Sequence, residues 1–394
     1  MQIDEERQRK AREYARLRRW LSLTSNAVLG LCAVLLIIFN VDKWLRDQLQ
    51  SVARQFPPLS WQPVPSWYPL QILLYFLIVT IILQIVTLPL SYYQGFVLSH
   101  RYGLSVMTLK AWFIDRLKGG GLGIALQAII VTLIYALLAF QPQTWWLWVA
   151  ICQLFFSVVL ANLAPVIIFP LFYKFSPLPD GELKQRLLTL AQRAGTSVRG
   201  VYTMHLSSKT TAANAAVMGL GNTRRIVLGD TMTDRYSTDE IEVVLAHELG
   251  HHVHNDMWKA LFYDSLLTLG GLFLCSLILH FVIDSWHYYL ALTDPATLLF
   301  LAVLAGLYGL IIAPLSNLNS RRAEYQADEY ALRATGKVAS FKSTMARLAN
   351  QNLAEIEPSP IIEFLFYSHP SIARRLKHAD DFAQRLTASH PEPS

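Results

Sequence analysis

The chain has 394 residues, of which 53% are hydrophobic and 16% are charged, and its formal net charge at pH 7 is +6. With a mean hydropathy of +0.32, this composition excludes an ordinary soluble protein, because lipid must cover part of so apolar a surface. The excess of basic residues is also typical of proteins that bind nucleic acid. Here, however, the basic residues cluster beside apolar segments, so we expect membrane lipids and no nucleic acid as partners.

Six apolar segments are long enough to cross the hydrocarbon core of a membrane. They lie near residues 20–41, 68–92, 121–140, 145–173, 259–284 and 296–317. Their length and near absence of charge exclude buried helices of a soluble core. The fourth is over-long and contains Pro165 and Pro170, which predicts a tilted or kinked helix. The three cysteines fall within these segments and lack ligand spacing, so we expect neither disulfides nor a thiolate metal site.

The distribution of lysine and arginine predicts how these segments cross the membrane. Residues 1–19 hold seven basic side chains, which should keep the N-terminus in the cytoplasm. The loop after the second segment is also basic, whereas residues 141–144, after the third, carry no charge. Lys43, Arg46 and Arg54 in the first outer loop are the exception. Six crossings place both termini in the cytoplasm, at the inner or plasma membrane of a bacterium or an ER-type membrane of a eukaryote.

The same pattern divides the chain into four parts. They are a basic arm with four membrane helices (1–173), a cytoplasmic insert (174–258), two further membrane helices (259–317) and a C-terminal cytoplasmic segment (318–394). Within the insert, residues 181–194 are predicted to be helical, and residues 198–205 and 225–228 are short strand candidates. A small sheet with an exposed edge would let an extended peptide add as a strand.

The most specific local pattern is His-Glu-Leu-Gly-His at residues 247–251. An apolar run at 241–246 leads into it, and a Ser-Thr-Asp-Glu sequence before that run offers an N-cap, so the motif lies inside a helix. His247 and His251 are one turn apart on one face and can bind one ion, with Glu248 beside them. A tetrahedral zinc ion bound by this pair would need one more protein ligand and a water molecule. The alternative is an ordinary solvated helix face.

We expect a third ligand from the polar segment 319–330, which we interpret as a second helix. Glu324 and Asp328 are one turn apart there, so one carboxylate can bind zinc while the other orients a zinc-bound imidazole through its free N–H. By itself the segment fits a charged, solvent-facing helix equally well. His252 and His254 are rival ligands, but they lie on other faces of the helix, so we expect them to be solvated or to lie behind the ligands.

The order of these motifs resembles the type I CAAX prenyl endopeptidases and their bacterial relatives. In that family a His-Glu-x-x-His helix is followed by Ser-Arg-x-x-Glu-x-x-x-Asp, here residues 320–328, with membrane spans around them. Asn214-Ala215 and residues 225–231 resemble the segment that precedes the zinc helix. His369-Pro370-Ser371, with Arg375 six positions after the histidine, matches the C-terminal signature. The motifs cover roughly residues 200–380.

The resemblance implies a mainly α fold, with about six transmembrane helices and a cytoplasmic zincin-type catalytic domain that contains a small β-sheet. It also implies a zinc metalloendopeptidase with one zinc ion per chain, held by His247, His251 and Glu324. In that reaction Glu248 takes a proton from the zinc-bound water and returns it to the leaving nitrogen. His369 would stabilise the oxyanion, a role that follows largely from the resemblance.

Four further residues have supporting roles in this interpretation. Asp328 would orient a zinc-bound imidazole, and Arg375 would either pair with Asp328 or support the loop of His369. Asn214 and Ala215 would offer backbone groups to the substrate. Asn214 equally fits a turn residue that uses its side chain locally.

Two functional classes remain open at this point. The first is a membrane-embedded endopeptidase acting on a peptide or protein, with or without a lipid. It would either remove the C-terminal residues after a prenylated cysteine, as CAAX proteases do, or degrade damaged membrane proteins as a quality-control protease. The second is a non-catalytic zinc-binding membrane scaffold, against which Glu248 argues, because a scaffold needs no general base. The sequence leaves the natural substrate and the oligomeric state open.

Overall fold

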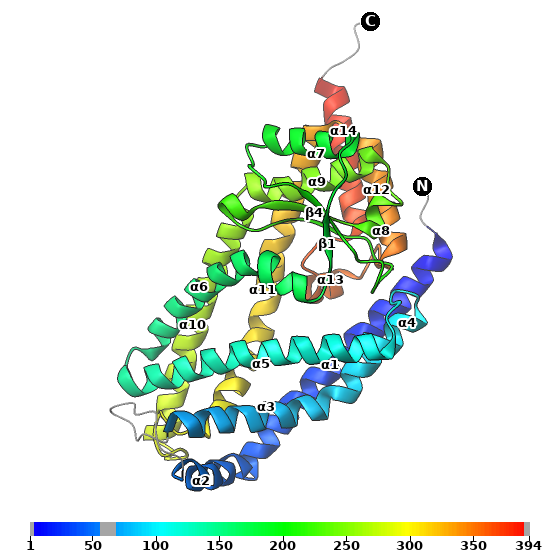
Figure 1. The fold of residues 1–394 in the computed structure, drawn as a ribbon. Helices are drawn as coiled ribbons and strands as arrows, with labels where there is room; N and C mark the ends of the chain where they lie inside the picture. Colours follow the sequence, from blue (N-terminus) through cyan, green and yellow to red (C-terminus); the bar gives the residue numbers. More distant parts are fainter. Residues whose placement is uncertain (1–3, 56–67, 390–394) are drawn as a thin grey trace, which may run out of the picture.

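The computed structural model describes residues 4–55 and 68–389 of the chain (Figure 1). In that part of the chain, six helices are long and apolar enough to cross a membrane. Their regular α-helical parts are α1 (Glu5–Ile38), α3 (Tyr68–Tyr92), α5 (Leu109–Phe140), α6 (Trp145–Leu163), α10 (Asp256–Asp284) and α11 (Thr297–Thr335). The predicted number of spans and the mainly helical membrane fold are therefore confirmed.

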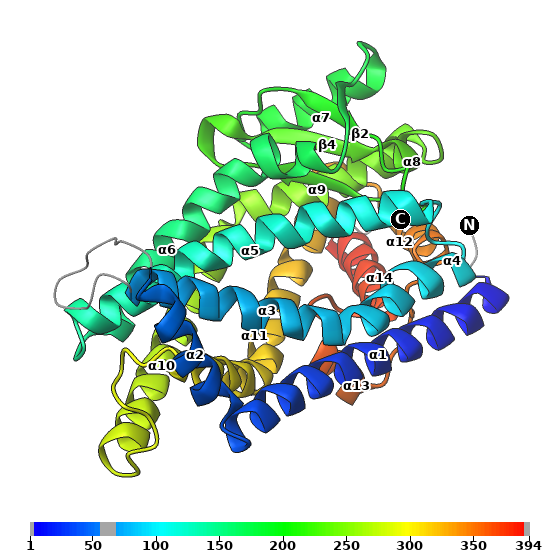
Figure 2. The ribbon, with the colours of Figure 1, turned by 60° about the horizontal axis from the view of Figure 1, so that its bottom comes forward.

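The six spans contact one another in a closed ring, in the order α1, α3, α5, α6, α10, α11 and back to α1. Figure 2 shows α1, α3 and α5 side by side along one face of the molecule. Protein covers little of the apolar surface of these helices: in the most apolar window of each span, at most 28% of the residues are buried. Such helices suit a bilayer, since their backbone groups bond internally and lipid can cover their side chains.

The end of α6 departs from regular α geometry. The helix continues as a π turn, η2 (Ala164–Ile168), and a 3-10 turn, η3 (Phe169–Leu171), and these turns contain Pro165 and Pro170. Proline has no N–H to donate and crowds the preceding turn, so the hydrogen-bond ladder changes register there. This is the local distortion that the two prolines predict. Similarly, α3 runs through a π turn, η1 (Tyr93–Leu98), into the short α4 (Ser99–Arg101).

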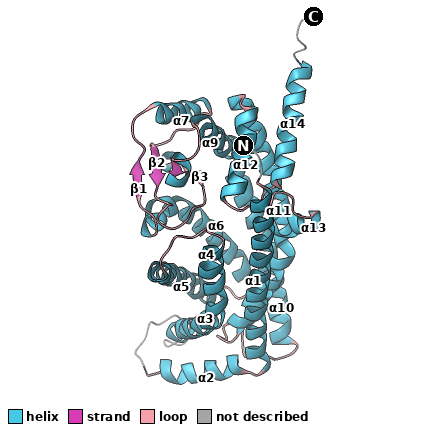
Figure 3. Cartoon of the chain, turned by 90° about the vertical axis from the view of Figure 1, so that its right-hand side faces the viewer, coloured by secondary structure: helices cyan, strands magenta, loops and turns pink. Residues whose placement is uncertain are grey.

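A short helix, α2 (Val41–Ala53), lies at the end of the spans that is remote from the sheet (Figure 3). It carries basic residues that are exceptions to the predicted charge distribution. Arg46 forms an ion pair of 2.7 Å with Asp294, and the ammonium of Lys43 lies 3.3 Å from the centre of the Tyr288 ring. These two charges are therefore partnered inside the protein, which explains how the loop accommodates them.

At the other end, a four-stranded sheet has the order β1-β2-β4-β3. The strands are β1 (Phe175–Pro177), β2 (Val201–Met204), β3 (Ala215–Met218) and β4 (Arg225–Gly229). β2 and β4 are parallel, and the other two pairs are antiparallel. The two predicted strands correspond to β2 and β4, whereas β1 and β3 were not predicted. β3 occupies an edge of the sheet, which matters for the site described below.

The sheet packs against α7 (Glu182–Arg193) and α9 (Thr238–Val253), with the single turn α8 (Asp230–Thr233) between β4 and α9. Their shared core includes Leu187, Ile226, Leu228, Ile241 and Leu245, all at most 1% exposed. Burying a side chain of this kind contributes about 1.5–3 kcal/mol. The chain then ends in α12 (Val338–Gln351), α13 (Pro360–Phe366) and α14 (Ile372–Ser389), which follow α11. This core fixes α9 against the sheet.

The helix α9 packs closely on the part of α11 that carries the polar motif. A Cβ atom added to Gly250 would lie 2.9 Å from the Cα of Ala327, so only glycine permits this approach. The 39 residues of α11 extend about 58 Å, well beyond a hydrocarbon core of about 30 Å. The segments 296–317 and 319–330, predicted as separate helices, are thus one continuous helix that joins the membrane part to the catalytic part.

Candidate metal centre and active site

Three side chains from α9 and α11 converge where the two helices pack. His247, His251 and Glu324 each offer one ligand atom, and these atoms lie within 4.8 Å of one another. The Nε2 of His247 is 3.4 Å from Oε2 of Glu324, and the Nε2 of His251 is 3.5 Å from Oε1. Ligand atoms around a tetrahedral zinc ion, with bonds of about 2.05 Å, are separated by about 3.3 Å. The three side chains therefore have the spacing that one metal ion requires.

The carboxylate of Glu324 lacks a complete set of protein partners. Its Oε2 atom is buried and has no hydrogen-bond partner among the described residues. Glu324 is 5% exposed and His247 is 8% exposed, so bulk water does not compensate. A buried acceptor without a partner is costly, whereas a cation between this oxygen and the two imidazoles would satisfy it. The residues present thus fit a metal ion.

Behind His247 lies a second carboxylate. The Nδ1 atom of His247 is 2.9 Å from Oδ1 of Asp328, and Arg375 donates to both oxygens of Asp328, at 2.8 Å through Nε and 2.5 Å through Nη2. The structure therefore brings Asp328 to the imidazole and Arg375 to Asp328, the first of the two arrangements expected for Arg375. Burial alone would lower the pKa of His247, but the neighbouring carboxylates of Asp328 and Glu324 outweigh it and raise the pKa to about 9.

His251 has an equivalent carboxylate that the sequence analysis missed. Its Nδ1 atom lies 3.0 Å from Oδ2 of Asp256, the second residue after α9's cap at His254. Asn255, between the helices, has a φ of 55°, and this left-handed residue turns the chain so that α10 begins beside His251. A five-residue separation does not place two side chains on one helix face, so the only available signal was the polar break between the helices.

Glu248 and His369 approach the same group of ligands. Glu248 is partly buried, and this burial raises the pKa of its carboxyl group. His369, from the loop after α13, is exposed, and its Nε2 lies 3.2 Å from Oε1 of Glu324. The structure therefore brings together a carboxylate and a third imidazole beside the proposed metal ligands, as the sequence motifs predict.

A cavity of about 400 Å³ opens onto Glu248 and His369. Asn214 and Ala215, at the start of the edge strand β3, form part of its wall. The side chain of Asn214 is exposed, but its backbone carbonyl already accepts a hydrogen bond of 2.8 Å from Gly229. The remaining wall is largely apolar, formed by Met232, Val244, Met345, Leu348 and Ile372. The cavity thus combines an edge strand, an apolar wall and the polar cluster.

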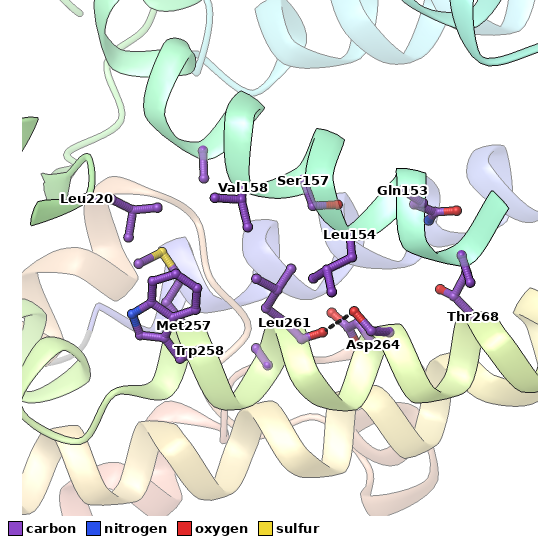
Figure 4. Close-up of a pocket in the computed structure, with 14 residues that line it drawn as sticks. Gln153, Leu154, Ser157, Val158, Leu220, Met257, Trp258, Leu261, Asp264 and Thr268 are labelled. Carbon is purple, nitrogen blue, oxygen red and sulfur yellow. Dashed lines mark hydrogen bonds between the residues drawn. The ribbon is translucent and has the colours of Figure 1, made fainter. Parts of the chain in front are cut away.

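Three other polar residues, two of them the rival histidines, lie outside this cluster. His252 faces the carbonyl of Val217 at 3.3 Å, and His254 faces that of Gly250 at 2.8 Å, as expected for residues on other helix faces. Asp264 lines a separate cavity of about 370 Å³ between α6 and α10, shown in Figure 4. There its carboxylate accepts a hydrogen bond of 3.4 Å from Ser316. None of these three residues joins the proposed metal ligands.

Two family models match consecutive parts of the chain. The model of peptidase family M48 matches residues 177–383, and the model described as CAAX prenyl protease N-terminal, five membrane helices, matches residues 1–174. Among curated relatives, CAAX prenyl protease 1 of Saccharomyces cerevisiae is 30% identical, covering 98% of this chain and 88% of its own length. The uncharacterized metalloprotease YhfN of Bacillus subtilis is 31% identical over 77% of this chain and 72% of its own length.

A solved structure agrees with these matches. The crystal structure of S. mikatae Ste24p superposes with a TM-score of 0.82 at 28% identity, covering 96% of this chain and 90% of that one. The matches thus extend over the membrane helices as well as the metal cluster, which sets aside the non-catalytic scaffold that the sequence left open. The chain belongs to peptidase family M48 and is a multi-pass membrane metalloprotease of the CAAX prenyl protease type.

Proposed function

We propose that this protein is a zinc endopeptidase that removes the residues following a prenylated cysteine near the C-terminus of its substrate. The observation that carries the proposal is the convergence of His247, His251 and Glu324 beside Glu248, in a cavity bounded by an edge strand. The substrate class comes from the relatives named CAAX prenyl protease 1 in two yeasts. Lipid around the ring of spans would hold the prenyl group near the enzyme.

In this proposal the two imidazoles and the Glu324 carboxylate hold one zinc ion per chain, since a mixed His and carboxylate donor set favours zinc. When bound, zinc polarises the scissile carbonyl and lowers the pKa of a water molecule to about 7. Asp328 and Asp256 accept hydrogen bonds from the Nδ1 sides of His247 and His251. They thereby leave each Nε2 free to act as a ligand.

The remaining side chains transfer protons, stabilise the oxyanion and hold Asp328 in its ionised form. Glu248 accepts the proton of the attacking water and later donates it to the leaving nitrogen, a task helped because burial raises the pKa of its carboxyl group. His369 donates a hydrogen bond to the oxyanion, since its Nε2 faces the ligand group. Arg375 fixes Asp328 through two hydrogen bonds and keeps it ionised.

Substrate binding follows from the walls of the cavity. A peptide in an extended conformation would lie along β3, next to Asn214 and Ala215, and its backbone would bond to free groups of that edge. The apolar wall around Val244 and Leu348 suits an aliphatic side chain after the scissile bond.

The proposal also covers the membrane topology. The basic residues of 1–19 favour cytoplasmic termini and a cytoplasmic active site, and the chain divides into four parts after residues 173, 258 and 317.

The test compares a farnesylated CAAX peptide with its unprenylated twin, using detergent-purified protein. Glu248→Ala provides the blank, and Asp264→Asn, in the separate cavity of Figure 4, provides a matched acidic control that should cleave normally. We expect Glu248-dependent cleavage that prefers the farnesylated peptide.

Two other results would change the proposal. Equal cleavage of both peptides would favour a broad membrane quality-control protease. Cleavage of neither peptide would contradict CAAX-type processing, and metal content measured on the same preparation would then show whether the zinc site itself had been lost.

A further inference from the structure

The active-site cavity shares a wall with a second, larger cavity. The second cavity, of about 730 Å³, lies between α1, α11 and the segments that flank α13. Residues that line both cavities are Asn352, Ala354, Glu355 and Tyr367. Tyr367 is two residues before His369, and two residues span at most about 7 Å. The shared wall therefore lies next to the proposed catalytic residues.

Two arginines of α1 line the second cavity. Arg18 is exposed, and no described residue forms an ion pair with it. Arg19 is mostly buried: its Nη1 donates to Oε2 of Glu355 at 2.8 Å and to the hydroxyl of Tyr367 at 3.0 Å. The hydroxyl of Tyr367 in turn donates to Glu355 at 3.0 Å. The N-terminal basic arm, expected only to orient the protein in the membrane, thus reaches the wall of the active site.

The guanidinium of Arg19 has unused donors. A guanidinium carries five N–H groups, and both contacts of Arg19 within the described part of the chain are made by Nη1. Nε and Nη2 therefore remain available, and together they match the two oxygens of a carboxylate. The described lining of this cavity contains both arginines and one carboxylate, Glu355, which pairs with Arg19, so it retains a positive charge that would attract an anion.

The rest of the second cavity is largely apolar. Its lining includes Leu310 and Pro314 from α11, and Leu365 and Phe366 at the end of α13. A ligand that fits has apolar side chains and ends in an anion. An extended three-residue peptide spans about 10 Å, and the two cavities that it would enter share the wall of Asn352, Ala354, Glu355 and Tyr367.

We propose that this second cavity holds the C-terminal end of the substrate, and that Arg18 and Arg19 bind its free α-carboxylate. This inference rests on the proposed function, since it assigns the residues that follow the cleaved bond. It explains how a peptidase with an open cavity would select a bond close to a chain end: an anchored carboxylate fixes the number of residues between the arginines and the metal ligands.

The test uses one farnesylated peptide in two forms, with a C-terminal carboxylate and with a C-terminal amide, cleaved by the full-length protein. We expect the wild-type protein to prefer the acid by about 10- to 100-fold in kcat/KM, mainly through KM, because charge-assisted hydrogen bonds of this size are lost with the amide. Arg19→Gln should remove most of this preference by slowing cleavage of the acid alone. Arg18→Gln, at an exposed position, should reduce the preference less and leave the fold intact.

Two variants separate substrate binding from a merely structural role of Arg19. Glu355→Gln breaks the same ion pair but keeps both arginines, so the preference for the acid should persist or increase. Arg9→Gln removes a charge from the same arm outside this cavity and should leave the preference unchanged. Equal cleavage of acid and amide by the wild type, or an equal loss of both in Arg19→Gln, would overturn the inference while the proposed function stands. Absence of any Glu248-dependent cleavage would contradict both.

Discussion

Buried carboxylates lie at both ends of the ring of spans, and their surroundings differ. At the end near α2, Asp294 accepts hydrogen bonds from Arg46 at 2.7 Å, from the amide of Leu290 at 3.1 Å and from that of Ala296 at 3.0 Å. At the other end, Glu324 keeps a buried oxygen without a hydrogen-bond partner among the described residues and faces the ring nitrogens of His247, His251 and His369.

The difference separates a structural carboxylate from a ligand. A carboxylate with hydrogen bonds from the protein to both oxygens and a charge partner, as at Asp294, holds its loop in place and does not need a further cation. A carboxylate that is equally buried but incompletely satisfied, and surrounded by imidazoles, needs a cation. The same helix, α11, starts beside the first carboxylate and carries the second. The helix α11 thus connects the end of the spans that holds the structural carboxylate to the end that holds the proposed metal ligand.

Glu324→Gln should have the largest effect on activity. The amide keeps the shape of the side chain but removes the ligand charge, so we expect cleavage to fall at least about 10³-fold, to near the background. The measurement is kcat/KM for the peptide described above. Activity within tenfold of the wild type would show that the Glu324 carboxylate is not a ligand.

Glu248→Gln should lower kcat by about 10²- to 10⁴-fold, because the general base is lost. Since Glu248 is not among the proposed ligands, the variant should bind metal as the wild type does. Activity and metal content measured on one preparation distinguish this variant from Glu324→Gln. Loss of the metal together with activity would move Glu248 into the ligand set.

Asp328→Asn should weaken metal binding by about 10- to 100-fold, because the carboxylate no longer orients His247. The matched control is Asp42→Asn in α2, which changes a buried carboxylate that accepts a hydrogen bond from Tyr289 at 3.2 Å and should leave the metal affinity unchanged. Competition with a chelator measures both. Equal weakening in the two variants would mean that the effect comes from general destabilisation.

Metal binding should release a proton at neutral pH. The pKa of His247 is raised to about 9, so the metal-free protein holds a proton there that a metal ion must displace. We expect metal affinity to fall by up to about tenfold per pH unit below pH 9 for this proton. In the metal-free protein the raised pKa of His247 also stabilises the folded state. This contribution is fully present below pH 6.5, the ordinary pKa of histidine, and is lost as the pH rises through about 9. Calorimetry in buffers with different ionisation enthalpies counts the protons, and a count of zero at pH 7 would contradict this expectation.

Asp294→Asn should have the smallest effect on activity. The site is remote from the cleavage chemistry, so the activity of the folded protein should change by no more than about twofold. Its stability should nevertheless fall by about 1–3 kcal/mol, because Arg46 loses its buried charge partner and keeps only the exposed Asp47, at 2.8 Å. Thermal unfolding in detergent checks the stability. A large loss of activity without a loss of stability would erase the distinction between the two ends.

The parts of the site that could be predicted depend on residues that are close together in the sequence. The spacing of His247 and His251 on α9, and of Glu324 and Asp328 on α11, follows from helix geometry. The predicted N-cap of α9 is Ser237, which forms a capping box with Glu240. The membrane spans were predictable because length and apolar content suffice to define them.

The parts that could not be predicted depend on packing between distant segments. Arg19 and Glu355 are 336 residues apart, and no local pattern connects them. Asp256 reaches His251 only because Asn255 adopts a left-handed conformation. β3 has four residues, two of them alanine, so its strand character comes from pairing with β4 rather than from its own propensity. The continuity of α11 through residue 318 could not be predicted either, because the change from an apolar to a polar sequence there does not change the backbone geometry.

Metal content is the most direct test of the distinction between the two ends. The wild type, Glu324→Gln and Asp294→Asn would be purified in parallel without chelator, dialysed against trace zinc and analysed by mass spectrometry for metal per chain. We expect one zinc per chain in the wild type and in Asp294→Asn, and almost none in Glu324→Gln. Zinc bound equally by all three proteins, or by none, would contradict the assignment of His247, His251 and Glu324 as the metal site.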